Sequence, residues 1–327
     1  MRGATLPRRE ADPAAAVSAP AAEFEAAMLQ ALRNRPRSIA PKFFYDRHGA
    51  ALFEQISRLD EYYLTRTEIA ILRERSQEIA RLIGPRAELV EFGAGSTDKA
   101  RIVLDVLASP ARYTPVDLSV ENLNSAKEDL ERSYPGLAVE PLAADFGRPL
   151  AVLMRRPGAG RRVGLFLGST IGNLSPGQAR DFLSGAAAGL GGGGLLVGVD
   201  LVKDPVVLHR AYNDAQGVTA AFNRNLLARA NRELGADFDL LSFNHYAFYQ
   251  PAEQRIEMHL VSARQQTVHV CGTPFEFAEG ESLHTENSYK YTIEGFRDLA
   301  RAAGLAPGAA WCDPQRHFSV HWLAAAP

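Results

Sequence analysis

The sequence predicts an α/β protein with a doubly wound parallel sheet, into which a second, α+β unit is inserted. Three observations predict it. Short apolar segments alternate with amphipathic segments from residue 66 to residue 202. The alternation stops there, and helical stretches and an alternating apolar–polar stretch follow. The earlier pattern then resumes at about residue 291 and continues to the C-terminus.

The predicted core begins with a helix over 66–83, whose apolar residues lie roughly on one side. Strand-like segments follow at 87–93, 112–119, 137–146, 162–170 and 191–202, separated by helical segments at 99–108, 120–134 and 176–190. The most convincing strand, RVGLFLGST, has the short apolar character of strands buried in a parallel sheet. This order indicates a Rossmann-like sheet with helices on both faces.

The predicted second unit combines an aromatic-rich stretch at 42–64 with the chain after residue 202. One or two helices are expected over 204–235, and an antiparallel hairpin around a PAEQ turn over 245–270. A helix ending at Gly304 and two strands close the chain. We expect a disordered tail at 1–20, one domain from 21–66 plus 203–290, and the other from 67–202 plus 291–327.

Composition excludes several classes of function. The 327 residues are 46% hydrophobic and 23% charged, as in an ordinary soluble protein. A net charge of -2 gives no electrostatic reason to expect nucleic acid or an anionic membrane as a partner. No apolar run approaches the roughly 18 residues that span a bilayer. Cys271 and Cys312 lack metal-ligand spacing, so we expect no metal site and a reducing cytoplasm.

Glycines and acidic residues mark the ends of three successive predicted strands. EFGAGST at 91–97 allows a tight turn and close approach of a ligand to the backbone. The third glycine of the dinucleotide fingerprint G-x-G-x-x-G is missing, which argues against a nicotinamide oxidoreductase. Asp117 ends the second strand, where it can take ribose hydroxyls, and Asp145-Phe146 ends the third, where the pair can bind and cover adenine. Together these features favour S-adenosylmethionine as the ligand.

A polar run late in the chain, HTENSYKYT at 284–292, fits either a surface turn or the floor of a binding pocket. A period of two places Thr285, Asn287 and Tyr289 on one side, and Glu286, Ser288 and Lys290 on the other. A carboxylate and a hydroxyl on one face can together bind the two nitrogens of one ring, because the carboxylate accepts N–H while the hydroxyl donates or accepts.

Long motifs in both predicted units resemble the L-histidine Nα-methyltransferases of ergothioneine biosynthesis. They are FFYD (43–46), EYYLTRTE (61–68), EFGAGSTDK (91–99), LGSTIGNL (167–174), AYNDAQGVTAAFN (211–223) and HTENSYKY (284–291). The resemblance runs from about residue 40 to the C-terminus. It implies a class I methyltransferase core joined to a substrate-binding domain that is built from the N-terminal region and an insertion after the fifth strand.

The resemblance also implies roles for individual residues. The implied contacts to S-adenosylmethionine are Tyr45, Gly93, Lys99, Asp117, Asp145 and Phe146, with Tyr45 near the transferred methyl group. Asn173 and Tyr212 would hold the substrate carboxylate, and Tyr62 would line the pocket. Glu286 and Ser288 would bind the imidazole, with Met258 packed against it. By composition alone, Lys99 is expected to be solvated, and strand alternation explains Met258 as well as a pocket role does.

Three functions therefore remain open at the level of the sequence. The first is conversion of L-histidine to Nα,Nα,Nα-trimethylhistidine in three steps that use S-adenosylmethionine. The second keeps the fold and methylates another amino acid or small amine. The third is a non-catalytic sensor of an adenosyl ligand, which the motifs in the second unit disfavour. We expect a cytoplasmic monomer with a small-molecule substrate.

Overall fold

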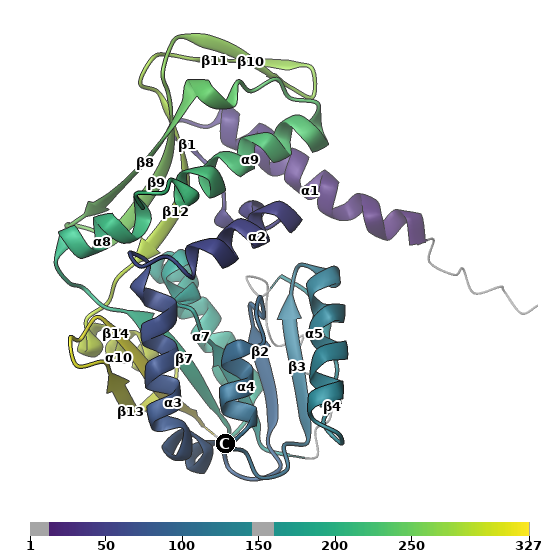
Figure 1. Ribbon diagram of the computed structural model, residues 1–327, viewed down its shortest axis with the longest axis vertical. Coiled ribbons are helices and arrows are strands. Elements are labelled where there is room, and N and C mark those ends of the chain that lie inside the picture. The colour runs from purple at the N-terminus through teal and green to yellow at the C-terminus, as the bar shows by residue number, and fades with distance from the viewer. Residues whose placement is uncertain (1–12, 146–159, 327) are drawn as a thin grey trace, which may run out of the picture.

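The computed structural model describes residues 13–145 and 160–326. Phe146, one of the predicted cofactor contacts, lies outside the described residues. Two sheets dominate the molecule (Figure 1). The larger sheet and its helices occupy one end, and the smaller sheet with α1, α2, α8 and α9 occupies the other. Strand and helix numbers follow Figure 1.

The larger sheet confirms the predicted doubly wound fold. Its order is β13-β14-β7-β6-β2-β3-β4, with β5 paired to β3. The strands are β2 (Glu88–Phe92), β3 (Arg112–Asp117), β4 (Ala138–Val139), β5 (Leu142–Ala143), β6 (Arg162–Phe166), β7 (Gly194–Asp200), β13 (Leu305–Cys312) and β14 (Phe318–Ala325). The strands from β2 to β7 pair in parallel, whereas β14 is antiparallel to both neighbours. The chain order reverses between β2 and β6, and ligands of such sheets bind at the carboxyl ends beside that reversal.

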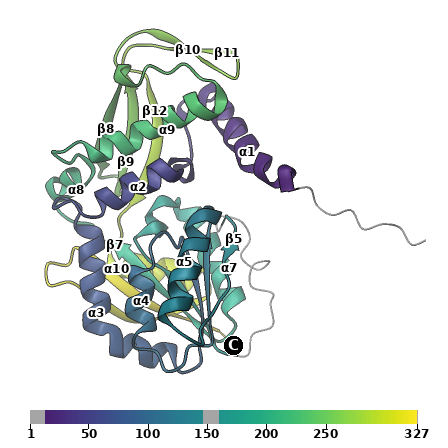
Figure 2. The ribbon, with the colours of Figure 1, turned by 45° about the vertical axis from the view of Figure 1, so that its right-hand side comes forward.

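Helices cover both faces of this sheet (Figures 1 and 2). One face carries α3 (Tyr63–Ile83), α4 (Asp98–Leu104) and α5 (Val120–Ser133), and the other carries α7 (Pro176–Leu190) and α10 (Ile293–Ala302). Successive strand residues serve opposite layers: Leu89 packs in the cluster that contains α3 and α4, whereas Val90 packs in the cluster that contains α7 and α10. The apolar character of the strands on both sides follows from this double cover.

The smaller sheet confirms the predicted α+β unit. Its order is β1-β12-β9-β8, formed by β1 (Arg37–Ser38), β8 (Phe243–Gln250), β9 (Arg255–Ser262) and β12 (Ser282–Tyr289), with a separate hairpin of β10 (Gln266–Val270) and β11 (Thr273–Phe277). Around it lie α1 (Pro13–Arg33), η1 (Pro41–Phe44), α2 (Arg47–Ile56), α8 (Pro205–Tyr212), α9 (Val218–Leu234) and η3 (Leu240–Ser242). Alternate residues of β9, including Met258, are buried beneath α9.

Two sequence expectations are corrected here. Helix α1 begins at Pro13, inside the predicted disordered tail 1–20, because its Ala-rich sequence favours a helix. The strand expected over 137–146 is reduced to β4 and β5, each of two residues. Pro141 lies between them and has no N–H to donate to a continuous ladder.

A bulge in β12 changes the predicted alternation at one residue. His284 pairs with His259 and Glu286 pairs with Met258, so Thr285 is the extra residue between them. We expected Thr285 to point away from Glu286, but its side chain is fully buried and donates to Asn223 Oδ1 of α9 at 2.8 Å. Beyond the bulge, Glu286, Ser288 and Lys290 share one face, as the period of two predicts.

Candidate functional site

The turn after β2 has the geometry expected for close approach of a ligand. Gly93 has a φ of 74°, in the left-handed region that favours glycine. The N–H groups of Gly93 and Ala94 both donate to the carbonyl of Val116 in β3, at 2.9 and 3.3 Å. This turn therefore ties the carboxyl end of β2 to that of β3, beside Asp117.

Two predicted aspartates lie at the same edge of the core sheet. Asp117 ends β3, accepts the Ser119 N–H at 2.9 Å, and has its pKa raised by burial. Asp145 follows β5, and its Oδ2 accepts from Lys42 Nζ at 2.7 Å. Lys42 belongs to η1 and also pairs with Glu23 of α1 at 2.7 Å. The predicted adenine contact of Asp145 therefore lies where the second unit meets the core.

Lys99 is not solvated, so the expectation from composition is wrong. Its ammonium lies 2.5 Å from the carboxylate of Glu68, which is fully buried. Both oxygens of Glu68 also accept the Gly168 N–H at 2.9 Å. Gly198 of β7 makes room for this carboxylate, because a Cβ there would lie 1.8 Å from Glu68 Oε1. The sequence contains a signal for Glu68 that we did not use: it shares the apolar side of α3 with Leu72.

Aromatic rings from four segments meet between the two sheets. Tyr45 contacts Phe222 at a centroid distance of 5.6 Å, and Tyr62 contacts Tyr212 at 6.3 Å. Tyr62 and Tyr212 are buried, whereas Tyr45 retains 39% exposure. Loss of solvent, and then the Glu286 carboxylate, raise the pKa of Tyr45 and of Tyr212 well above the usual value. Asp117 raises the pKa of Tyr45 as well, so this phenol lies within electrostatic reach of both the cofactor end and the substrate end.

The Glu286 carboxyl group of β12 has no hydrogen-bond partner in the part of the chain that the structure describes. Its residue is 9% exposed, and burial raises its pKa to about 7 although the Lys290 ammonium opposes that rise. Among the described residues, none donates a hydrogen bond to this carboxylate. Met258 lies directly across from it on β9 and is 1% exposed. Residues directly opposite in an antiparallel pair share a face, so Met258 lies beside Glu286 as well as in the strand core.

Ser288 belongs to a buried polar network. The Tyr212 hydroxyl donates to Ser288 Oγ at 2.8 Å. Lys290 Nζ donates to Ser288 Oγ at 2.8 Å and to the Tyr212 oxygen at 3.1 Å, and it pairs with Asp200 Oδ2 at 2.8 Å. Lys290 and Asp200 are both 0% exposed as side chains. The sequence prediction contained Ser288 and Tyr212 but assigned no role to Lys290 or Asp200.

Asp200 anchors this network at the end of β7. It accepts from the Tyr63 hydroxyl at 2.8 and 2.9 Å and from Lys203 Nζ at 2.6 Å. Burial alone would raise the pKa of Asp200. The ammonium groups of Lys290 and Lys203 outweigh that effect, so the pKa lies below its usual value and the carboxylate stays ionised. Burial lowers the pKa of Lys203 to about 8. An acid at the end of a predicted strand, as with Asp117, was the available signal for Asp200.

Asn173 reaches the same region from the core. It ends η2 (Thr170–Asn173), which packs against β12. The packing is tight at Gly172, where a Cβ would lie 2.8 Å from the Tyr289 carbonyl oxygen and 3.5 Å from Ser288 Oγ. The structure therefore brings together side chains that the sequence placed far apart, from α3, η2, α8, β9 and β12.

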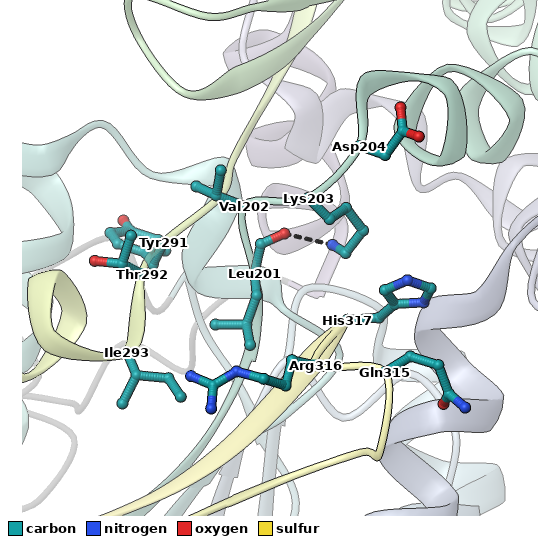
Figure 3. Close-up of a pocket in the computed structure, with 10 residues that line it drawn as sticks. All are labelled: Leu201, Val202, Lys203, Asp204, Tyr291, Thr292, Ile293, Gln315, Arg316 and His317. Atoms are coloured by element: carbon teal, nitrogen blue, oxygen red, sulfur yellow. Dashed lines mark hydrogen bonds between the residues drawn. The ribbon is translucent and has the colours of Figure 1, made fainter.

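A separate cavity is lined in part by the chain that follows β7 (Figure 3). Its volume is about 390 Å³, and its lining includes Lys203, Tyr291, Arg316 and His317. Lys203 points from its wall toward the Leu201 carbonyl. None of the predicted site residues within 13–145 and 160–326 lines it. Among the described residues, this cavity has no counterpart to Glu286, a buried carboxyl group that receives no hydrogen bond. We therefore assign the candidate site to the region around Glu286.

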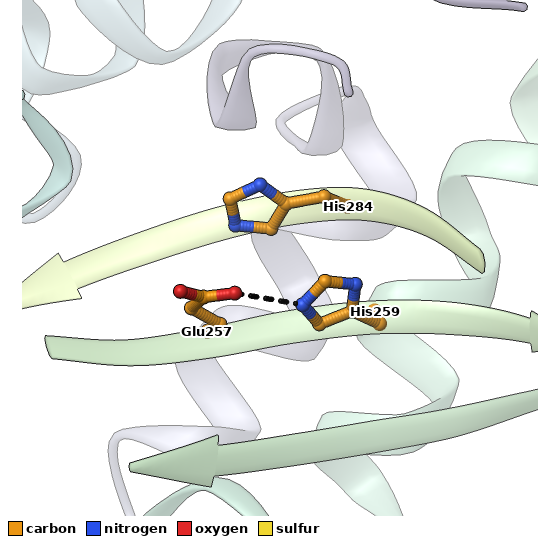
Figure 4. Close-up of side chains that lie close together, drawn as sticks. All are labelled: Glu257, His259 and His284. Atoms are coloured by element: carbon orange, nitrogen blue, oxygen red, sulfur yellow. Dashed lines mark hydrogen bonds and ion pairs between the residues drawn. The ribbon is translucent and has the colours of Figure 1, made fainter. Parts of the chain in front are cut away.

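A second group of ionisable side chains lies on the opposite face of the smaller sheet (Figure 4). One ligand atom from each of Glu257, His259 and His284 lies within 4.8 Å of the others. Glu257 pairs with His259 Nε2 at 3.1 Å and with Arg255 at 2.7 Å. The two imidazole rings stack at 4.7 Å with an interplanar angle of 18°. Stacked rings do not direct their in-plane lone pairs at one point, as metal ligation requires, and Arg255 already neutralises the carboxylate.

Within the described ranges, every helix is too short or too polar to cross a membrane.

Comparison with known proteins finds similarity to histidine-specific methyltransferases along nearly the whole chain. The family model described as "Histidine-specific methyltransferase, SAM-dependent" matches residues 24–325. The histidine N-alpha-methyltransferase of Mycolicibacterium smegmatis is 45% identical over 88% of this chain and 91% of its own length. The enzyme of the same name from Mycobacterium tuberculosis is 43% identical over the same shares. Ergothioneine biosynthesis protein 1 of Neurospora crassa is 29% identical over 89% of this chain but 34% of its own length.

Proposed function

Because the chain belongs to the family of histidine-specific methyltransferases that depend on S-adenosylmethionine, we propose that it methylates the α-amino nitrogen of L-histidine. Three transfers give Nα,Nα,Nα-trimethylhistidine, or hercynine, as the first step of ergothioneine biosynthesis. The observation that carries this proposal is the buried pair on β12: Glu286, to whose carboxyl group none of the described residues donates a hydrogen bond, and Ser288 on the same face. We also propose that 21–66 plus 203–290 bind the substrate and 67–202 plus 291–327 bind the cofactor.

The residues at the carboxyl ends of β2 and β3 fit S-adenosylmethionine. The left-handed turn at Gly93 leaves no side chain between the backbone and a ligand. Asp117 keeps its carboxylate beside that turn, where it suits a ribose diol. We propose that Gly93, Lys99, Asp117 and Asp145 hold the cofactor, together with Phe146, which lies outside the described residues. The cofactor supplies an electrophilic methyl group bound to a positively charged sulfur.

The chain's own task in such a transfer is alignment. The attacking amine must be neutral, with its lone pair directed along the sulfur–methyl axis, and fixing that geometry can contribute several kcal/mol. We propose that Tyr45 aims the amine; its ring packs against Phe222 between the two units, and the charges of Glu286 and Asp117 both raise the pKa of its phenol. Its raised pKa makes it a hydrogen-bonding phenol rather than a base, so solvent removes the proton. The ring faces of Tyr45 and Phe222 can stabilise the growing ammonium.

The substrate side chain is recognised at β12. We propose that Glu286 accepts an imidazole N–H and that Ser288 binds the other nitrogen, with Met258 packed beside the ring. A hydrogen bond to an ionised group contributes about 1.5–3 kcal/mol, which is roughly a tenfold to hundredfold preference for imidazole over a phenyl ring. Asn173 and Tyr212 would hold the carboxylate, and Tyr62 would close the pocket beside Tyr212.

Mass spectrometry tests the proposed function directly. The purified chain is incubated with L-histidine and S-adenosylmethionine, and mono-, di- and trimethylated histidine are followed over time. The proposal requires the trimethylated product to accumulate. A panel of other amino acids, assayed for release of S-adenosylhomocysteine, shows whether histidine is preferred. Turnover of another amine with none of histidine would overturn the substrate assignment and keep the methyltransferase chemistry.

A further inference from the structure

Lys290 is a buried cation whose three hydrogens are all committed. The ammonium donates to Ser288 Oγ at 2.8 Å, to the Tyr212 oxygen at 3.1 Å and to Asp200 Oδ2 at 2.8 Å. An ammonium carries three N–H donors and no acceptor, so no hydrogen of Lys290 remains for a ligand. Lys290 therefore acts on a substrate only through the groups that it holds.

The two hydroxyls also contact each other, which limits what they can offer. Tyr212 and Ser288 are joined by one hydrogen bond of 2.8 Å. Each hydroxyl has one hydrogen, and Lys290 occupies an oxygen lone pair on both. Because Tyr212 donates across this contact, the hydrogen of Ser288 remains to point toward a substrate. When Ser288 uses this hydrogen for the ring and Tyr212 keeps its bond to Ser288, the proposed contact of Tyr212 with the carboxylate supplies no hydrogen, and Asn173 is the donor to the carboxylate.

From this geometry we propose that Lys290, anchored by Asp200, is a positioning residue that fixes Ser288 and Tyr212 so that they present a single outward hydrogen beside Glu286. The inference rests on the proposed function and adds to it a residue that sets the hydrogen-bond pattern of the side-chain pocket. One carboxylate acceptor and one shared donor match a neutral imidazole, which has one N–H and one unprotonated nitrogen. A phenyl ring satisfies neither group, and leaving buried polar groups unpaired disfavours its binding.

The charge of Lys290 has a second effect on the same pocket. It lowers the pKa of Glu286, opposing the rise caused by burial. Asp200 faces Lys290 from β7 and remains ionised, and Lys203 faces Asp200 from beyond the strand end. Removing the Lys290 charge must therefore raise the pKa of Glu286, so a higher pH is needed to ionise it.

The test compares Lys290→Met with Lys203→Met. Both variants remove an ammonium from Asp200, but among the described hydroxyls Lys203 contacts only that of Tyr63. For Lys290→Met we expect the KM for histidine to rise about tenfold or more, the Kd for S-adenosylhomocysteine to stay within about threefold, and the acidic limb of kcat/KM to move to higher pH. For Lys203→Met we expect a change in the KM for histidine of less than about threefold, because the hydroxyl that Lys203 contacts is that of Tyr63 and not one of the pocket.

A double variant keeps the inference testable if Lys290→Met does not fold because Asp200 has lost one of its two buried cationic partners. Lys290→Met/Asp200→Asn removes both charges and should show the same rise in KM. An unchanged KM, equal defects from Lys290→Met and Lys203→Met, or parallel loss of S-adenosylhomocysteine binding in the double variant would each overturn the positioning role. If the wild-type protein makes no methylated histidine, the proposed function itself is overturned.

Discussion

Two glutamates on neighbouring strands of the smaller sheet differ in what surrounds them. Glu257 of β9 lies on the outer face, where Arg255 and His259 lower its pKa although burial alone would raise it. Glu286 of β12 lies on the inner face, where burial raises its pKa to about 7 and Lys290 only partly opposes the rise. The outer carboxylate has partners within hydrogen-bonding distance, and the inner one has none among the described residues. The inner glutamate is therefore the one that can accept a hydrogen bond from a ligand.

The largest expected effect separates these two glutamates directly. Glu286→Ala should lower kcat/KM for histidine by about tenfold to hundredfold, because the charge-assisted bond to the ring is lost. Glu257→Ala is the matched control and should stay within about threefold. Calorimetry with S-adenosylhomocysteine should give similar Kd values for both variants and the wild type. Equal losses of activity would make the two faces equivalent and contradict the assignment of the pocket to the inner face.

Gly172→Ala tests whether the inner face depends on close packing against η2. The added Cβ would lie 2.8 Å from the Tyr289 carbonyl oxygen, so η2 and Asn173 must shift away from β12. We expect the KM for histidine to rise about tenfold, since small misplacements of positioning groups have effects of this order. Steady-state kinetics measures this KM, and a thermal unfolding experiment shows whether the variant is still folded. A KM equal to that of the wild type would show that Asn173 does not position the substrate.

The pH dependence sharpens the comparison through the raised pKa of Glu286. Only ionised Glu286 makes the stronger, charge-assisted bond to an N–H, so kcat/KM should fall as pH drops through about 7. Stability should have the opposite slope: the folded-state pKa lies above the unfolded value, so this group's contribution is lost as pH rises from about 4.5 to about 7. Glu286→Gln should remove both effects. A pH profile that is identical in the variant would assign the acidic limb to another group.

The smallest effect is expected on the outer face. His259→Ala removes the contact with Glu257 and the ring stacking with His284. Both side chains are mostly buried, and a hydrogen bond and a stacked ring pair each contribute about 1 kcal/mol, so we expect a loss of about 1–2 kcal/mol in the free energy of unfolding and almost no change in activity. Urea unfolding measures the free energy of unfolding, and the histidine methylation assay measures the activity. A large fall in activity would show that the outer face communicates with the pocket.

The sequence predicted most of the fold because its signals are local. Apolar strands that end in glycine or aspartate identified the core sheet, and the loss of that pattern after residue 202 identified the second unit. The errors have local causes as well. Pro141 divides a predicted strand, and a bulge at Thr285 turns one side chain to the face that alternation excludes.

The prediction of the site was less complete because buried ion pairs form between distant segments. Glu68 and Lys99 lie on successive core helices, and nothing in the composition of either helix shows that they pair. Lys290 appeared in the polar run but had no assigned role, because Asp200 and Tyr212 reach it from other elements. Most of the candidate site residues were predicted from the resemblance of the motifs to a known family. The contacts among these residues came from the structure.

The sequence by itself determined the doubly wound sheet, the inserted α+β unit and the shared face of Glu286 and Ser288, because periodicity along one segment specifies each of these. The packing of distant segments, in contrast, leaves the Glu286 carboxyl group without a hydrogen-bond partner among the described residues while that of Glu257 has several. It also decided that Lys290 holds both hydroxyls of the pocket. These properties depend on which segments meet when the two sheets pack together, and the burial that follows sets the charge state of each group.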